Sequence, residues 1–199
     1  MSARAGMSNL ISRLRSLTNA GTAQFTLNGT NYFSDDHLQE LLDSNVQILS
    51  NHPLTWVPDT IGGGTIQWTR ALIGYNDLEE ASSGTTRWIV RDATGAEQGT
   101  ANYTPDYVVG EILFDADQGG TIYYLSARSY DLYAAAADVW KMKQSFYSEW
   151  FAVSSEGQKM EWQQAFDHAV RMEESMRGMS GRNSKSDSVW TSEFVRVDV

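Results

Sequence analysis

Apolar residues recur every three or four positions over residues 130–153, which is the pattern of an amphipathic helix. Two apolar stripes are present, so the polar face of this helix is narrow. The first stripe consists of Leu132, Ala135, Val139, Met142, Phe146, Trp150 and Val153, and the second of Tyr130, Tyr133, Ala137, Trp140, Tyr147 and Phe151. A helix with two apolar faces needs neighbours on both sides. We therefore expect a subunit interface that uses Tyr133, Trp140, Tyr147 and Phe151.

A second helix is predicted after the short loop at residues 154–157, because apolar residues again recur on one side. These residues are Trp162, Ala165, Phe166, Ala169, Met172 and Met176. Two helices joined by so short a loop pack antiparallel. Gly178 and Gly181 are expected to end the second helix.

Residues 181–199 read as a polar linker followed by a segment rich in strand-forming residues. Its apolar residues have no evident core in their own protomer. They are Val189, Trp190, Phe194, Val195, Val197 and Val199. We expect an extended tail that is donated to a partner protein.

Two shorter helices are predicted in the first 53 residues. Ser8 can cap the first, which residues 19–21 stop. Ser34 or Asp35 can cap the second, whose stop is Pro53. The apolar stripe of this second helix runs through Leu38, Leu41, Leu42, Val46 and Leu49. Both helices are expected to join the C-terminal pair in one bundle.

From residue 54 to 125 the apolar period changes from about 3.6 to about 2. Strand-like runs occur at residues 55–57, 65–69, 86–91, 107–109, 111–114 and 121–125, separated by glycine-containing turns. The predicted fold is α+β: an antiparallel helical bundle, residues 1–53 and 126–180, with an inserted small antiparallel β-domain, residues 54–125. An extended tail, residues 181–199, completes it.

Three stretches resemble a known family of proteins. They are residues 128–140, reading RSYDLYAAAADVW, residues 154–158, reading SSEGQ and followed by a Met-rich helix, and residues 34–43, reading SDDHLQELLD. Together they are similar to the head-to-tail connector, or adaptor, proteins of long-tailed double-stranded-DNA bacteriophages. The resemblance spans roughly residues 33–199 and rests on helix-packing patterns.

This resemblance implies a structural virion protein that forms a ring, usually of twelve copies, between the portal and the tail or neck. Such a ring forms part of the DNA channel during genome packaging and DNA ejection, and DNA passes through without specific binding. The partners implied are the portal protein, further copies of this chain, and a tail-side neck or tail-completion protein. The implied place is the neck of the virion, after assembly in the host cytoplasm, and the tail would dock on the portal.

The net charge of the chain agrees with a protein that does not bind nucleic acid. The chain has 15 basic and 25 acidic residues and a net charge of −10. Three arginines and no acid lie in residues 1–20, whereas residues 61–126 hold three arginines and nine acids. Phosphate binding needs a basic surface, so DNA or RNA binding is disfavoured. No cysteine is present, which excludes disulfides, and neither a secretory signal nor a membrane segment is expected.

No motif predicts catalysis, a metal or a cofactor. The glycines at 62–64 lack the Lys-Ser/Thr of a phosphate loop. The turn at residues 115–120 begins like a calcium loop, but Ser126 stands where a bidentate Glu is needed. His37, His52 and His168 lack the spacing of a zinc site. We therefore expect no enzyme activity.

Two other classes of function stay open. The β-region is rich in aromatics that could bind carbohydrate or a host surface: Trp56, Trp68, Trp88, Tyr103, Tyr107, Tyr123 and Tyr124. An enzyme that uses scattered carboxylates is the other alternative, although no sequence feature favours it.

Overall fold

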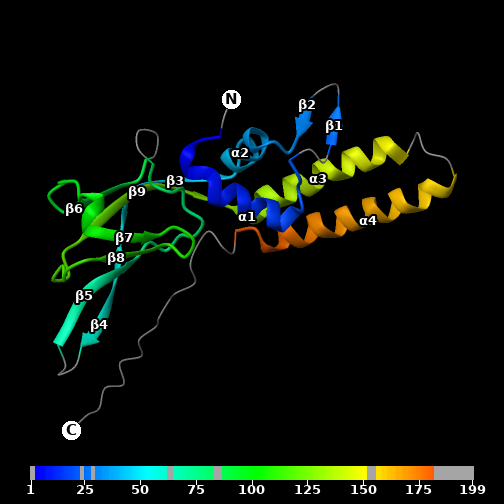
Figure 1. Ribbon diagram of the computed structural model, residues 1–199. Coiled ribbons are helices and arrows are strands. Elements are labelled where there is room, and N and C mark those ends of the chain that lie inside the picture. The colour runs from blue at the N-terminus through cyan, green and yellow to red at the C-terminus, as the bar shows by residue number, and fades with distance from the viewer. Residues whose placement is uncertain are drawn as a thin grey trace, which may run out of the picture.

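The computed structural model describes residues 3–22, 25–27, 30–61, 65–82, 87–151 and 156–181. Figure 1 shows two parts, a β-sandwich at one end and a group of helices at the other. The α-helices are α1 (Ser8–Thr18), α2 (Asp35–Asp43), α3 (Leu132–Phe151) and α4 (Glu156–Met179). Short 3-10 helices precede α1, at Ala5–Met7, and β7, at Thr100–Asn102.

Nine strands are present in the described residues, and all the pairs are antiparallel. They are β1 (Phe25–Leu27), β2 (Thr30–Tyr32), β3 (Val46–Pro53), β4 (Thr55–Ile61), β5 (Thr65–Leu72), β6 (Ile89–Asp92), β7 (Tyr103–Asp106), β8 (Glu111–Phe114) and β9 (Tyr123–Tyr130). The order is β3-β9-β6 in one main sheet and β4-β5-β8-β7 in the other, and β1-β2 is a separate hairpin. The two main sheets pack face to face over a core that includes Leu49, Ala71, Ile112 and Leu125.

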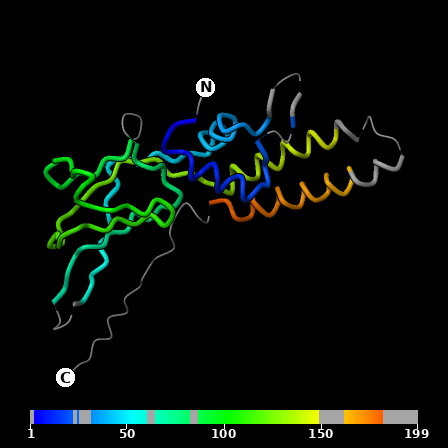
Figure 2. Tube along the Cα trace, viewed as in Figure 1, coloured from blue at the N-terminus to red at the C-terminus, as the bar shows by residue number. Residues whose placement is uncertain are grey.

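The helices share a second core. Figure 1 and Figure 2 show α3 and α4 as an antiparallel pair. Helices α1 and α2 pack against α3, and the β1-β2 hairpin lies beside α3. Buried alanines of α3, among them Ala135 and Ala136, allow close packing, and Leu10, Leu14 and Leu38 fill the space from α1 and α2.

The expectation of a helical bundle with an inserted small β-domain is wrong. The class is α+β, but two antiparallel sheets make up one whole part of the molecule. They join the helical part without linkers: β3 begins at Val46, three residues after α2 ends, and its partner β9 ends at Tyr130, two residues before α3 begins.

The error has a local cause. Val46 and Leu49 continue the helical spacing of α2, so they read as its last turns. However, Asn45 ends the helix, because its Nδ2 donates to Leu41 O at 2.9 Å. The β-branched residues that follow then pair with β9, starting with Val46 opposite Tyr130.

Other predicted elements compare as follows. Ser34 is the cap of α2, accepting from His37 N at 3.3 Å, and Asn19 ends α1 with a positive φ. Strand β8 has the predicted limits, whereas residues 107–110 form a turn in place of a strand. Strands β1, β2 and β7 were missed altogether.

All three prolines of the chain lie in edge strands: Pro53 in β3, Pro58 in β4 and Pro105 in β7. Proline has no N–H to donate, so it weakens an edge as a template for another strand. The free edge of β6 is covered by a following segment of the same chain, because Gln98 N donates to Val90 O at 2.8 Å. The sandwich is therefore protected against strand addition.

Gly110 is the tightest backbone contact in the sandwich. It has a φ of +80°, and a Cβ there would lie 1.8 Å from Tyr75 O. We predict that Gly110→Ala lowers the free energy of unfolding by about 3 kcal/mol or more. Gly95→Ala is the matched control, because Gly95 has a φ of +87° and open space around it, so only the backbone cost of about 1 kcal/mol remains. Urea denaturation would measure both, and equal losses would contradict the steric account.

Candidate functional site

The predicted interface helix, α3, is covered on its second face by its own protomer. Trp140 is only 4% exposed, and its ring meets His168 of α4 edge to face at 5.4 Å. Tyr147 packs between Phe25 of β1 and Trp162 of α4, with ring centroids 5.9 and 6.0 Å away. Intramolecular neighbours thus take up much of the apolar surface that was expected to face another subunit.

Tyr133 and Tyr147 are half-buried, so they are the members of the predicted interface still reachable from outside. The side chain of Phe151 lies outside the described part of the structure, and so does all of residues 182–199, which include the predicted anchors Trp190 and Phe194. The covering role of β1 was missed, because this three-residue strand is too short to carry a clear sequence signal.

Lys143 is a buried cation on α3. It is 1% exposed, and its Nζ donates to Thr18 O at 2.7 Å and to Asn19 O at 3.3 Å. These two carbonyls end α1, so Lys143 caps that helix from a different helix. Its Nζ also lies 4.6 Å from the ring centroid of Trp140. Burial lowers the pKa of Lys143 to about 8.

A charged group joins the helices to the sheets. It consists of Arg4, Asp43, Glu79, Arg128 and Tyr130, and we call it the junction cluster. Arg4 donates from both terminal nitrogens to Asp43, at 2.7 and 2.6 Å. Glu79, 3% exposed, accepts from Arg4 Nε and Arg128 Nη1 at 3.2 Å each and from the Tyr130 hydroxyl at 2.7 Å.

The pKa directions follow from these contacts. Burial, followed by the hydrogen bond to Glu79, raises the pKa of Tyr130, so its hydroxyl stays a donor. Burial alone would raise the pKa of Asp43, but the hydrogen bonds from Arg4 outweigh it and hold the pKa below its usual value. Each ionised group therefore has an opposite charge beside it.

A second ion pair supports the same junction. Arg13 of α1 donates to Asp77, which is buried in the segment between β5 and β6. Burial raises the pKa of Asp77, and Arg13 opposes that rise. The three arginines that read as a basic N-terminus are thus all neutralised by acids of the same chain: Arg4, Arg13 and Arg15.

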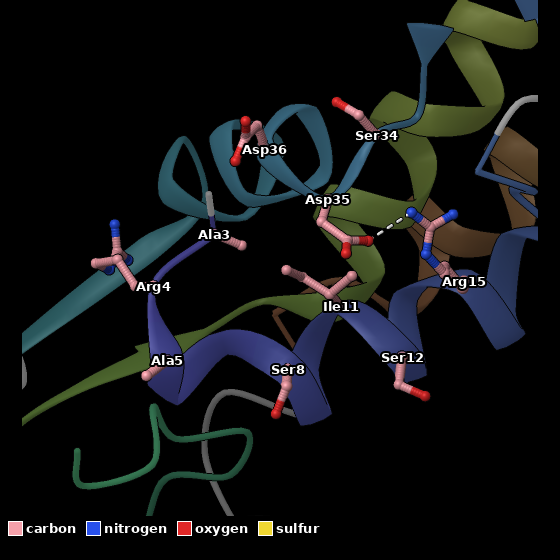
Figure 3. A pocket seen from close by; sticks show the side chains of 10 residues that line it. All are labelled: Ala3, Arg4, Ala5, Ser8, Ile11, Ser12, Arg15, Ser34, Asp35 and Asp36. Atoms are coloured by element: carbon pink, nitrogen blue, oxygen red, sulfur yellow. Dashed lines mark hydrogen bonds and ion pairs between the residues drawn. The ribbon is translucent and has the colours of Figure 1, made fainter. Parts of the chain in front are cut away.

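A groove of about 650 Å³ lies between the N-terminal arm, α1 and α2. Figure 3 shows Ser8, Ile11, Ser12 and Arg15 along α1, opposite the start of α2. One end is bridged by Arg15, whose Nη2 lies 2.7 Å from Asp35 Oδ1. Because the Arg15 guanidinium is already paired with Asp35, it is not free to bind a ligand, and the lining of the groove does not indicate a particular ligand.

Asp131 links both ends of the helical hairpin. Its Oδ1 accepts from Ala134 N at 2.9 Å and so caps the start of α3. Its Oδ2 accepts from Ser180 Oγ at 2.9 Å and from Gly181 N at 2.8 Å, at the end of α4. The chain therefore leaves α4 at the junction between helices and sheets.

Nothing in the described part of the chain has the arrangement of a metal centre, since no three His, Asp or Glu side chains gather there. In the turn after β8, the Asp117 carboxylate accepts hydrogen bonds from Trp68 N at 2.9 Å and from Gly119 N at 3.0 Å. These backbone hydrogen bonds give the carboxylate a structural role in the turn. Over the residues that the structure describes, no helix has both the length and the apolar character needed to span a membrane.

Comparisons with protein-family models, with curated proteins and with solved structures found no match for this chain.

The first prediction here concerns Lys143. Its pKa is about 8 in the folded protein against 10.5 for an ordinary lysine, so between these values the unfolded chain binds more protons and stability rises with pH. We predict that the free energy of unfolding of the wild type, relative to Lys143→Met, increases by about 1–2 kcal/mol from pH 8 to pH 10. Urea titrations of both proteins would measure it. A difference that stays flat or falls would show that Lys143 titrates normally.

The second prediction concerns Glu79. Its removal leaves Arg4 and Arg128 without their shared carboxylate in a largely buried place. We predict that Glu79→Ala lowers the free energy of unfolding by about 3–5 kcal/mol. Glu174→Ala, at an exposed position of α4, should change it by less than about 0.5 kcal/mol. A loss at Glu79 no larger than that at Glu174 would mean that the junction cluster does not hold the two parts together.

Proposed function

We propose that this chain is a structural virion protein, an adaptor subunit whose ring joins the portal of a long-tailed bacteriophage to its tail or neck and forms part of the DNA channel. The observation that carries the proposal is the place of residues 128–140. This stretch, one of the three that resemble the adaptor family, forms the end of β9 and the start of α3.

Four polar residues of that stretch act at or beside the junction. Arg128 and Tyr130 bind Glu79, and Asp131 caps α3 and holds the end of α4. Asp138 accepts from Asn45 Nδ2 at 3.0 Å. The sequence pattern therefore corresponds to the joint between the helices and the sheets of this protomer.

The shape of the protomer also supports assembly through unlike surfaces. The sandwich and the helical hairpin lie at opposite ends (Figure 1), so neighbouring copies in a ring would meet through different patches, as head-to-tail rings require. Tyr133 and Tyr147 are the proposed contributors from α3. The predicted dodecamer and the tail-side neck partner belong to this proposal.

The contact of Gly181 with Asp131 fixes the point from which the proposed portal-docking tail would extend. Gly181 is tied to Asp131 at the joint, and residues 182–199 follow it. An extended chain covers about 3.3 Å per residue, so this segment can reach roughly 60 Å from the joint. That reach is enough to contact another protein while the protomer keeps its own fold.

The channel role agrees with the charges. The net charge is −10, and the arginines of the N-terminus are paired within the chain. A wall built from such a surface would let DNA pass without binding its phosphates. The proposal assigns the chain no enzymatic activity.

The carbohydrate-binding alternative has less support. Sugar stacking needs an open ring face, but Trp88, Tyr103 and Tyr123 are at most 8% exposed. Trp56 donates from Nε1 to Thr121 O at 2.6 Å and packs on Phe114. These aromatics mainly fill the core of the sandwich.

The proposal predicts how the tail acts. The double variant Trp190→Ala/Phe194→Ala should weaken binding to the cognate portal ring by about 100-fold or more, because buried aromatic anchors carry much of an interface's free energy. Its melting temperature should stay within about 2 °C of the wild type, because the proposal assigns both anchors to the portal interface and not to the cores of the protomer. Biolayer interferometry and calorimetry would measure these quantities.

The matched control is Ser188→Ala/Ser192→Ala, which changes the same segment without removing an aromatic ring. Portal binding of the Trp190/Phe194 variant equal to that of the control would count against a portal-docking tail. Cryo-electron microscopy of the particle neck would test the ring itself, and an absence of this chain there would end the proposal.

A further inference from the structure

A cavity of about 680 Å³ opens on the sandwich beside edge strand β7. Three aromatic residues form much of its wall: Trp88 next to β6, Tyr103 at the start of β7 and Tyr107 in the turn after it. Glu97 contributes a carboxylate at the rim. We call this cavity the Trp88 pocket.

The aromatic wall is held rigidly. Trp88 Nε1 donates to the Tyr103 hydroxyl at 3.1 Å, and the rings of Trp88 and Tyr107 meet edge to face with centroids 4.9 Å apart. Tyr107 O also accepts from Leu78 N at 2.8 Å, which ties the turn to the junction side of the sandwich. A ligand would therefore meet a preformed wall and pay little entropy to order it.

The pocket is electronegative. Burial raises the pKa of both phenols, and a carboxylate adds to each rise, Glu97 for Tyr103 and Glu80 for Tyr107. No lysine or arginine is among the described residues that line it. Glu97 is exposed, and Arg91 lies opposite it in an isolated antiparallel bridge. Within the described chain no ion pair joins the two side chains.

These features select a cation with a flat, weakly hydrated head. A guanidinium packs against aromatic groups and donates to a carboxylate and a phenol oxygen at once. Trp88 and Tyr103 are only 8% and 5% exposed, so the ring on which a guanidinium can pack is that of Tyr107, which is half-buried. A sugar would need a broader open ring face than this single ring offers. Residues 61–126 hold nine acids and three arginines. Asp77 and Glu79 are neutralised by arginines outside this range, and the acids that remain in excess would attract a basic segment over a longer range.

We propose that the Trp88 pocket binds an arginine side chain presented by a basic segment of a partner protein. This site shares no residue with Tyr133 and Tyr147, the α3 contacts proposed for the ring, and the proposal does not depend on that function. Edge strand β7 cannot recruit the same segment by full strand pairing, because Pro105 lacks an N–H. Recognition is therefore by a side chain in a pocket, with the edge only beside it.

The test is a titration of the full chain, labelled with ¹⁵N-tryptophan, with N-acetyl-L-arginine amide. The indole signal of Trp88 should shift and saturate at millimolar ligand. Glu97→Gln should weaken binding by at least about fivefold, because a charge-assisted hydrogen bond is lost. Asp115→Asn removes the same charge from another exposed residue of the sandwich and should leave the affinity within about twofold.

Three results would overturn the proposal. One is an equal affinity for the Glu97→Gln and Asp115→Asn proteins. Another is a Trp88 shift with N-acetylglucosamine and none with the arginine amide, which would identify a sugar site. The third is tighter arginine binding after Arg182→Gln, Lys185→Gln and Arg196→Gln are combined, since the occupant would then be the chain's own tail.

Discussion

The fold depends on how one buried carboxylate is neutralised. Glu79 lies where the N-terminal arm, α2 and β9 meet, and it is satisfied only when Arg4, Arg128 and Tyr130 all reach it. Removing an ionised carboxylate from water is costly unless charges and hydrogen bonds compensate. The helices and sheets are therefore coupled, because neither part alone holds every partner of Glu79. Arg13 with Asp77 and the two-sided contacts of Asp131 lie around the same joint and strengthen it.

The surface of the molecule favours contacts through faces, pockets and extensions over contacts through strand edges. Each edge strand of the two main sheets that could accept a neighbour carries a proline or is covered by its own chain. A protein that assembles in many copies would otherwise risk uncontrolled sheet growth. An adaptor ring would gain from this, since its subunits must meet one another only in the closed geometry. The proposed arginine site in the Trp88 pocket and the proposed portal-docking tail, residues 182–199, would make specific contacts that do not need an open edge of the sandwich.

The covering of α3 changes what ring formation would require. The sequence showed a helix with two apolar faces, and a second subunit was the expected cover. In the structure α4 and the β1-β2 hairpin supply it, and Lys143 joins Trp140 to the end of α1. The protomer can thus be stable before it assembles, and a ring would use the half-buried tyrosines and the outer surfaces. A stable free protomer fits assembly on a portal that acts as a template.

Sequence alone determined the features that depend on near neighbours: the helix-forming stretches, a cap of α2 at Ser34 or Asp35, the end of α1 within residues 19–21, the limits of β8 and the acidic balance. These follow from spacing and from local hydrogen bonds, which involve residues within a few positions of each other. Tertiary structure alone decided that Val46 and Leu49 belong to a strand, since both positions fit either period and the choice is made by pairing with β9, about 80 residues away. Tertiary structure also decided that Trp140 is buried within its own protomer, and it created the junction cluster and the Trp88 pocket. The residues of the junction cluster lie tens of positions apart in the chain, and so do some of those that line the Trp88 pocket. Only the folded chain brings together the charges of the cluster and the rings of the pocket.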